Sequence, residues 1–442
     1  MKLLYTFLIL LVVTSCKNET ATISSSSTTA PSVVTSTADY DSYLDLDDSN
    51  YIAALRADID SLESLVAVNG TGVLDLGRLA SKLNELYDLK ANVKDLNRAV
   101  EMREAVVANM YVNPASSKRA LAQSYIKQHR FKKADSLMKS FATGKLSAES
   151  QMVYFDIAME LGDYTRARKM LDSLTSSNDY NYLIRAAKWN DHKGDLSATI
   201  RLMETAKDLA DKSGSPALQL WSNSNIADYY GHDGQIQNSY DHYLKTLKQD
   251  PSNTYALKGI AWIVYSHEKN PEEALRILNK IKERHPLPDY DLAIAEIKEY
   301  QNDADSVAKL KNAFLTEVAN PAYGAMYNTY KIEQLLSGDA SQKKEALVIA
   351  SNEIKNRSTP ETQSLLSYAM LKNGNKEHAL KNQEMYVIDK TFEPVAQLHS
   401  LEILMDNGKN KEALTYTSDL SGAAYELGPV TTKHYFELIS KI

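Results

Sequence analysis

The chain has 442 residues, 43% of them hydrophobic and 24% charged, a balance typical of a soluble folded protein. Its 57 acidic and 50 basic residues give a formal charge of −7, so no basic surface for a polyanion is evident and a nucleic-acid partner is not expected. Tyrosine is abundant, with 27 residues against 7 phenylalanines, which favours aromatic side chains that pack an apolar body and keep a polar tip in water.

The first 15 residues have the pattern of a signal peptide. Lys2 supplies a positive charge, and residues 3–13 form an apolar run that is too short to span a membrane, which needs about 20 such residues. The sequence Val13-Thr14-Ser15-Cys16 resembles the lipobox of bacterial lipoproteins, in which the cysteine carries the lipid. Cys16 is also the only cysteine, so an internal disulfide is impossible. We therefore expect cleavage after residue 15 and lipidation of Cys16.

Residues 16–45 are predicted to be a disordered tether. The stretch is dominated by Ser, Thr and Ala and has too little apolar surface to offset its conformational entropy. Its start, Lys17-Asn18-Glu19, resembles the export signal of surface lipoproteins in the Bacteroidetes group. This resemblance implies a membrane-anchored protein of the bacterial envelope, in the outer membrane, with its periplasmic or surface face left open.

The remainder is predicted to be helical throughout, because amphipathic stretches with helical spacing follow one another. In residues 46–116 two such stretches, 51–66 and 76–112, are interpreted as diverged or capping helical hairpins. Residues 117–442 repeat with a period near 34 residues, the length of a paired-helix unit. Three sets of residues keep this phase: Pro251, Pro286 and Pro321; Tyr230, Tyr265 and Tyr300; and Gly374 with Gly408, Ala379 with Ala413, and Pro360 with Pro394.

These residues resemble the tetratricopeptide-repeat pattern, in which an aromatic closes the first helix, glycine turns the chain, alanine admits the second helix and proline ends the unit. The resemblance covers residues 117–420 and departs from the pattern at Thr199 and Ser239, which replace the alanine, and at Glu268, which stands where the turn glycine is expected. It implies an all-α superhelical solenoid of stacked hairpins, since one hairpin cannot bury its apolar stripe alone. A lone capping helix is expected over residues 431–442.

No catalytic, metal or cofactor motif is complete. His267-Glu268 is followed by Pro271 and lacks the second histidine of a zinc-protease helix. Gly70 and Gly72 lack the third glycine of a dinucleotide loop, and the pair His232 and His242 has no ligand spacing typical of a metal site. We expect neither catalysis nor a cofactor.

The default binding surface of such a solenoid is the concave groove lined by the first helix of each pair. Counting along the repeat pattern places seven candidate partner-binding residues on this face: Asp156, Lys188, Trp221, Asp228, Lys298, Tyr368 and Glu402. The leading hypothesis is therefore a non-catalytic scaffold for a protein or peptide partner. The alternative is a glycan-binding nutrient lipoprotein similar to the starch-utilisation type, and a hydrolase with a helical toroid is the third option.

Overall fold

The computed structural model describes residues 32–70, 72–112, 114–141, 144–174 and 178–442. The signal peptide, Cys16 and the tether up to residue 31 lie outside these residues. Over the described ranges the chain is helical and contains no strand, which confirms the all-α prediction. The first half comprises α1 (Thr37–Leu44), α2 (Ser49–Asn69), α3 (Val73–Lys90), α4 (Val93–Asn109), α5 (Ala115–Lys127), α6 (Phe131–Lys139), α7 (Ala148–Leu161), α8 (Tyr164–Asp172), α9 (Tyr180–His192), α10 (Leu196–Ser213), α11 (Pro216–His232) and α12 (Ile236–Gln249).

The second half contains, in chain order, α13 (Thr254–Trp262), the π-helix η1 (Ile263–His267), α14 (Pro271–Arg284), α15 (Asp289–Tyr300), α16 (Ala304–Glu317), the 3-10 helix η2 (Pro321–Tyr323), α17 (Asn328–Leu336), α18 (Ala340–Asn356), α19 (Pro360–Lys372), α20 (Lys376–Tyr386), α21 (Pro394–Asp406), α22 (Asn410–Ala413), η3 (Leu414–Tyr416), α23 (Thr417–Gly422) and α24 (Ala424–Ile439). Each helix packs mainly on the next one in the chain, as in a solenoid of stacked hairpins.

A recurring two-residue turn joins the helices of several hairpins. One residue takes the left-handed conformation that ends a helix, and the next caps the following helix with its side chain. Gly194 has φ 75°, and the Asp195 carboxylate accepts the backbone N–H of Ala198 at 2.9 Å. The predicted crossing residues Ala379 and Ala413 are fully buried, and so are alanines at the equivalent places of other hairpins: Ala134, Ala167 and Ala274. Thr199 and Ser239 are buried at the equivalent places, so small volume rather than alanine itself is what the packing requires.

One turn differs from the prediction. The left-handed residue between η1 and α14 is Lys269, with φ 57°, and not Glu268. The π-helical turn of η1 adds a residue to the first helix and moves the turn by one position. Glu268 therefore does not occupy the left-handed position. Its carboxylate instead accepts the backbone N–H groups of Val34 and Thr35 at 2.8 Å.

The predicted end of the tether is wrong. Residues 32–45, expected to be disordered, lie across α12 and α14, and residues 37–44 of this segment form α1. Tyr40 is fully buried, and its hydroxyl donates to Glu273 at 2.7 Å. The Ser/Thr-rich composition concealed a short segment that buries a tyrosine and a leucine, Leu44. The predicted helical stretch 76–112 also divides, into α3 and α4, because Ala91 is left-handed and Asn92 caps α4.

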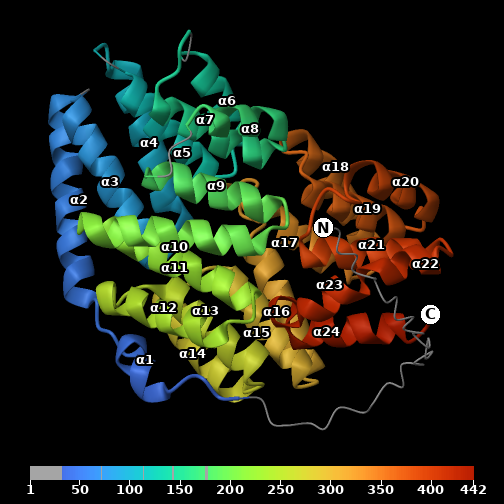
Figure 1. The fold of residues 1–442 in the computed structure, drawn as a ribbon. Coiled ribbons are helices and arrows are strands. Elements are labelled where there is room, and N and C mark those ends of the chain that lie inside the picture. Colours follow the sequence, from blue (N-terminus) through green and yellow to red (C-terminus); the bar gives the residue numbers. More distant parts are fainter. Residues whose placement is uncertain (1–31, 71, 113, 142–143, 175–177) are drawn as a thin grey trace, which may run out of the picture.

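The solenoid closes on itself. In Figure 1 the orange and red helices of the C-terminal part lie against the teal and green helices of the first half. The backbone N–H of Ser358 donates to the carbonyl of Leu161 at 3.4 Å, and Arg357 pairs with Glu160 at 3.6 Å. Further along, Asn97 donates to the carbonyl of Ala322 at 3.0 Å. The concave side predicted to be an open groove is therefore partly covered by the chain's own later hairpins.

The last helix takes part in this closure. It begins at Ala424, bends at Gly428, and packs on α11, α15, α21 and η1, so it is not a lone cap at the end of the stack. The carbonyl of Tyr425 accepts the Trp262 indole N–H at 3.0 Å and the Ser266 hydroxyl at 2.6 Å. The helix expected over residues 431–442 is present as the end of α24, but its isolation was wrongly predicted, because periodicity reports local pairing and carries no information on these distant contacts.

Candidate functional site

Closure of the solenoid leaves a hollow between its two halves, which we call the central chamber. Its main part, about 680 Å³, is bounded by α7, α8, α9 and α11 on one side and by α19, α21, α23 and α24 on the other. Two smaller hollows of about 290 and 260 Å³ adjoin it, since one shares His232 and Glu426 with it and the other shares Glu361 and Glu393. This volume lies in the range of ordinary ligand sites.

Carboxylates dominate the chamber wall. Of the residues that the structure describes, three Lys or Arg side chains line it: Lys188, Lys258 and Arg357. The carboxylates that line it are Glu160, Asp191, Asp228, Glu333, Glu361, Glu393, Asp419 and Glu426. The three cations are already engaged, because Lys188 pairs with Glu160 at 3.0 Å, Lys258 pairs with Asp289 at 2.6 Å, and Arg357 pairs with Glu353 at 3.1 Å.

Four of these carboxylates are uncompensated. Among the described residues no hydrogen bond or ion pair reaches the side chains of Asp191, Glu333, Glu361 or Glu393. Burial raises the pKa of Glu393 to about 8, with further contributions from the negative charges of Glu426, Glu361 and Asp191. Burial also raises the pKa of Glu333 to about 7 and that of Asp191 above its usual range. The chamber therefore concentrates carboxyl groups that no described cation pairs with, and their raised pKa values mean that protonation relieves part of their mutual repulsion while the chamber is empty.

Aromatic side chains line the chamber beside these carboxylates. Tyr164 stacks on His192 with ring centroids 3.9 Å apart, and Phe392 lies directly over Gly194, where any Cβ would collide with its ring. In the adjoining hollow, Tyr243 and Tyr255 both donate hydrogen bonds to Asp228. The remaining aromatic residues of that hollow are Trp262, Tyr265 and Tyr425. Aromatic faces next to uncompensated carboxylates suit a cation that carries an apolar stem.

The seven residues predicted for the concave face are not brought together. Lys188 lines the main chamber and Asp228 lines the adjoining hollow. Asp156 lies in a pair of hydrogen bonds with Arg185, at 2.7 and 3.1 Å, and Lys298 pairs with Asp303 at 3.8 Å. Trp221 is 40% exposed and packs edge-on against Tyr180. Binding of a partner by these residues stays a prediction.

Tyr368 and Glu402 contact each other directly. The Tyr368 hydroxyl donates to Glu402 at 3.0 Å, while Lys372 and His434 bind the same carboxylate at 3.0 Å each. Burial alone would raise the pKa of Glu402, but the hydrogen bond from His434 and the charge of Lys372 lower it to about 2. This buried, fully paired network joins α19, α21 and α24 and so stabilises the C-terminal hairpins.

The sequence interpretation missed Glu361 and Glu393. Glu361 follows Pro360 at the start of α19, and Glu393 precedes Pro394 as the N-cap of α21. The two prolines had been recognised as a 34-residue repeat, so the acidic residue beside each was an available signal. What the repeat could not reveal is that closure turns both helix starts towards α9 and α11.

Within the described residues, no group of three or more His, Cys, Asp or Glu side chains has an arrangement that could hold a metal ion. No helix of the described ranges is both long and apolar enough to cross a bilayer. The fold and the chamber thus define an all-α solenoid of tetratricopeptide-like hairpins that closes around an acidic, aromatic-lined hollow.

No family model matches the chain, and no curated protein matches it either. Among solved structures the chain is similar to the crystal structure of yeast Tom70. The two are 14% identical, with a TM-score of 0.39, and the match covers 88% of this chain and 85% of that one.

Proposed function

We propose that the chain is a non-catalytic scaffold that binds a protein partner in the bacterial envelope, and that the central chamber receives an extended, Lys- or Arg-rich segment of that partner. One observation carries the proposal: four carboxylates without partners among the described residues face the chamber, and the Lys and Arg side chains of the described residues that line it are already paired. A lysine or arginine entering the chamber would relieve this repulsion and gain charge-assisted hydrogen bonds.

The aromatic lining supports the same kind of occupant. Lysine and arginine stems pack on aromatic faces while their charged ends reach a carboxylate. A neutral glycan would bring no cation to pair with Glu361 and Glu393, so the acidic lining gives no reason to prefer the nutrient-binding alternative.

We also propose that a lipid on Cys16 holds the scaffold at the outer membrane. The lipobox-like sequence Val13-Thr14-Ser15-Cys16 and the absence of any other cysteine in the chain support the anchor. Residues 17–31 separate Cys16 from Ser32, where the hydrogen-bonded N-terminal segment begins with a contact to His267.

Binding of a fluorescently labelled octalysine peptide, followed by anisotropy at about 150 mM salt, tests the chamber. Octalysine should bind, and octaglutamate should not. Replacing Glu393 and Glu426 together by Gln should weaken octalysine binding at least tenfold, a change of about 1.4 kcal/mol. The salt concentration matters because it screens attraction to the general negative charge of the surface.

The matched control replaces Glu283 and Glu437 by Gln. These residues lie on α14 and α24 and do not line the chamber, and the control replaces the same number of carboxyl groups by amides. Equal weakening in the chamber variant and the control variant would contradict the proposal, because it would mean that octalysine follows net charge alone.

A further inference from the structure

A second hollow lies among the first helices of the solenoid and is separate from the central chamber. It is a groove of about 870 Å³ between α2, α3, α4 and α5, which we call the N-terminal groove. It is lined by side chains of these four helices, from Asp58 on α2 to Ala120 on α5. None of them lines the central chamber.

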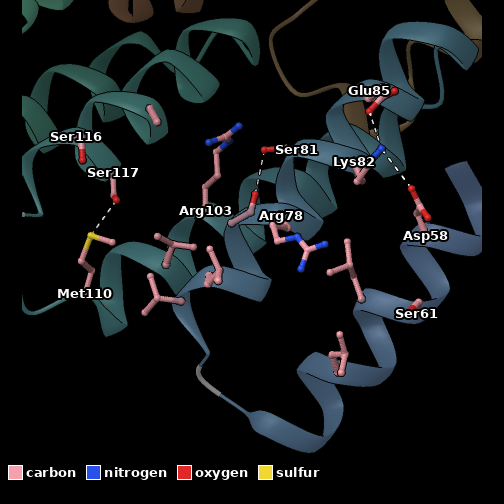
Figure 2. Close-up of a pocket in the computed structure, with 17 residues that line it drawn as sticks. Asp58, Ser61, Arg78, Ser81, Lys82, Glu85, Arg103, Met110, Ser116 and Ser117 are labelled. Atoms are coloured by element: carbon pink, nitrogen blue, oxygen red, sulfur yellow. Dashed lines mark hydrogen bonds and ion pairs between the residues drawn. The ribbon is translucent and has the colours of Figure 1, made fainter.

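The groove is polar at one end and apolar at the other. Along α3, which runs through it, Val73 and Leu74 stand at the start of the helix and Lys82 and Glu85 stand two to three turns later. The polar end is closed by ion pairs, because Lys82 lies 3.4 Å from Asp58 and 3.5 Å from Glu85 (Figure 2).

The apolar end is open to water. Leu74 is 76% exposed and Leu65 is 42% exposed, although both line the groove. Contiguous apolar surface of this kind on a soluble domain usually marks a binding site. Further exposed apolar side chains follow α4 on the chain, Tyr111 and Val112, near Met110 of the groove.

Arg103 is the one cation of the groove that has no partner. No hydrogen bond, ion pair or ring contact reaches its guanidinium from any described residue, and Figure 2 draws no interaction from it. Burial lowers the pKa of this guanidinium below its usual value, with no compensating carboxylate. Arg78, by comparison, lies 3.9 Å from Asp75 and Lys82 is doubly paired. A guanidinium held over an apolar surface offers two parallel N–H donors to a carboxylate.

Gly77 leaves space beside these groups. It lies inside α3, where glycine is less stable than alanine, and a Cβ added to it would meet no other heavy atom within 4 Å. The missing side chain therefore opens the groove at the level between the apolar residues Val73 and Leu74 and the hydroxyl of Ser81.

We propose that the N-terminal groove binds a single-chain amphiphile with an anionic head, a fatty carboxylate, whose head group pairs with Arg103 and whose chain lies along the apolar end. Charge and polarity both select this class. A neutral lipid would leave Arg103 unpaired, a cationic amphiphile would meet a like charge, and a small inorganic anion would leave the apolar end exposed to water.

Isothermal titration of the full chain tests the proposal, with Cys16→Ala introduced so that no attached lipid can compete. The probes are decanoate, 1-decanol and decyltrimethylammonium, which share a chain and differ in head-group charge. Decanoate should bind with a stoichiometry of one, and the other two should bind at least tenfold more weakly. Decanol binding as tightly as decanoate would overturn the proposal.

Two variants locate the site. Arg103→Gln should weaken decanoate binding at least tenfold while leaving decanol unchanged, and Gly77→Leu should abolish binding of decanoate by filling the groove. Both variants should keep the parent's thermal unfolding midpoint or exceed it, because Arg103 has no partner to lose and Gly77 has free space. Lys433→Gln, which removes an exposed cation on α24, is the matched control and should bind decanoate like the parent. Parent-like decanoate binding by either groove variant would overturn the assignment.

Discussion

Glu393 is the residue at which the electrostatics of the central chamber can be measured most simply. Its side chain is accessible to water within the hollow, yet protein surrounds it and three other carboxylates lie near it. Its pKa is about 8 in the folded chain and about 4.3 when unfolded. Folding therefore favours the protonated form, and the stability gained from it is complete below pH 4 and is lost as the pH rises through 8.

We predict that the thermal unfolding midpoint falls between pH 5 and pH 9, and that Glu393→Gln reduces this fall. Glutamine resembles the protonated acid, so the variant should match the parent at pH 5 and exceed it at pH 9. Glu296 and Glu333, with pKa values of about 7, act in the same direction. Calorimetry at the two pH values measures the effect, with Glu283→Gln as control. A parent midpoint that stays constant or rises over this interval would be inconsistent with the chamber described above.

At the scale of the element, the sequence predicted most of what local chemistry determines. The predicted turn glycines Gly374 and Gly408 take the left-handed conformation, and the small residues predicted at the helix crossings are buried there. The π-helical turn of η1 was not predictable, because an inserted residue leaves the apolar spacing almost unchanged. Burial of Tyr40 was equally hidden, since it depends on Glu273, more than 200 residues away.

The N-terminal segment has two parts with different expected roles, a lipid attachment point and an ordered segment bound to α12 and α14. We predict that Cys16→Ala leaves the helical body folded and moves the protein from the membrane fraction to the soluble fraction. Mass spectrometry of the variant shows whether the signal peptide has been cleaved or retained. Circular dichroism and fractionation of host cells measure the two effects. A Cys16→Ala chain that is still processed at residue 15 and still sediments with membranes would refute the anchor.

The closed shape of the whole molecule depends on contacts between distant hairpins, which the repeat pattern of the sequence does not reveal. The periodicity of the sequence predicted a solenoid with an open concave face. The stacked hairpins of the structure confirm the solenoid. The face is covered because the chain from η2 to α24 returns onto α4, α7 and α11, through contacts such as Ser358 with Leu161 and Asn97 with Ala322. Five of the seven predicted groove residues consequently lie outside the chamber, while Glu361 and Glu393, brought in from the later repeats, line it.

Closure is the claim on which the central chamber depends, and a disulfide across it is the most direct test. Leu161→Cys and Ser358→Cys, in a chain with Cys16→Ala, replace two residues whose backbones are joined by a 3.4 Å hydrogen bond. Their Cα atoms should lie within the roughly 4.4–6.8 Å that a disulfide requires. We predict rapid intramolecular crosslinking under mild oxidation, seen as a mobility shift reversed by reductant and absent from each single-cysteine chain. Only intermolecular products, or none, would contradict a closed solenoid.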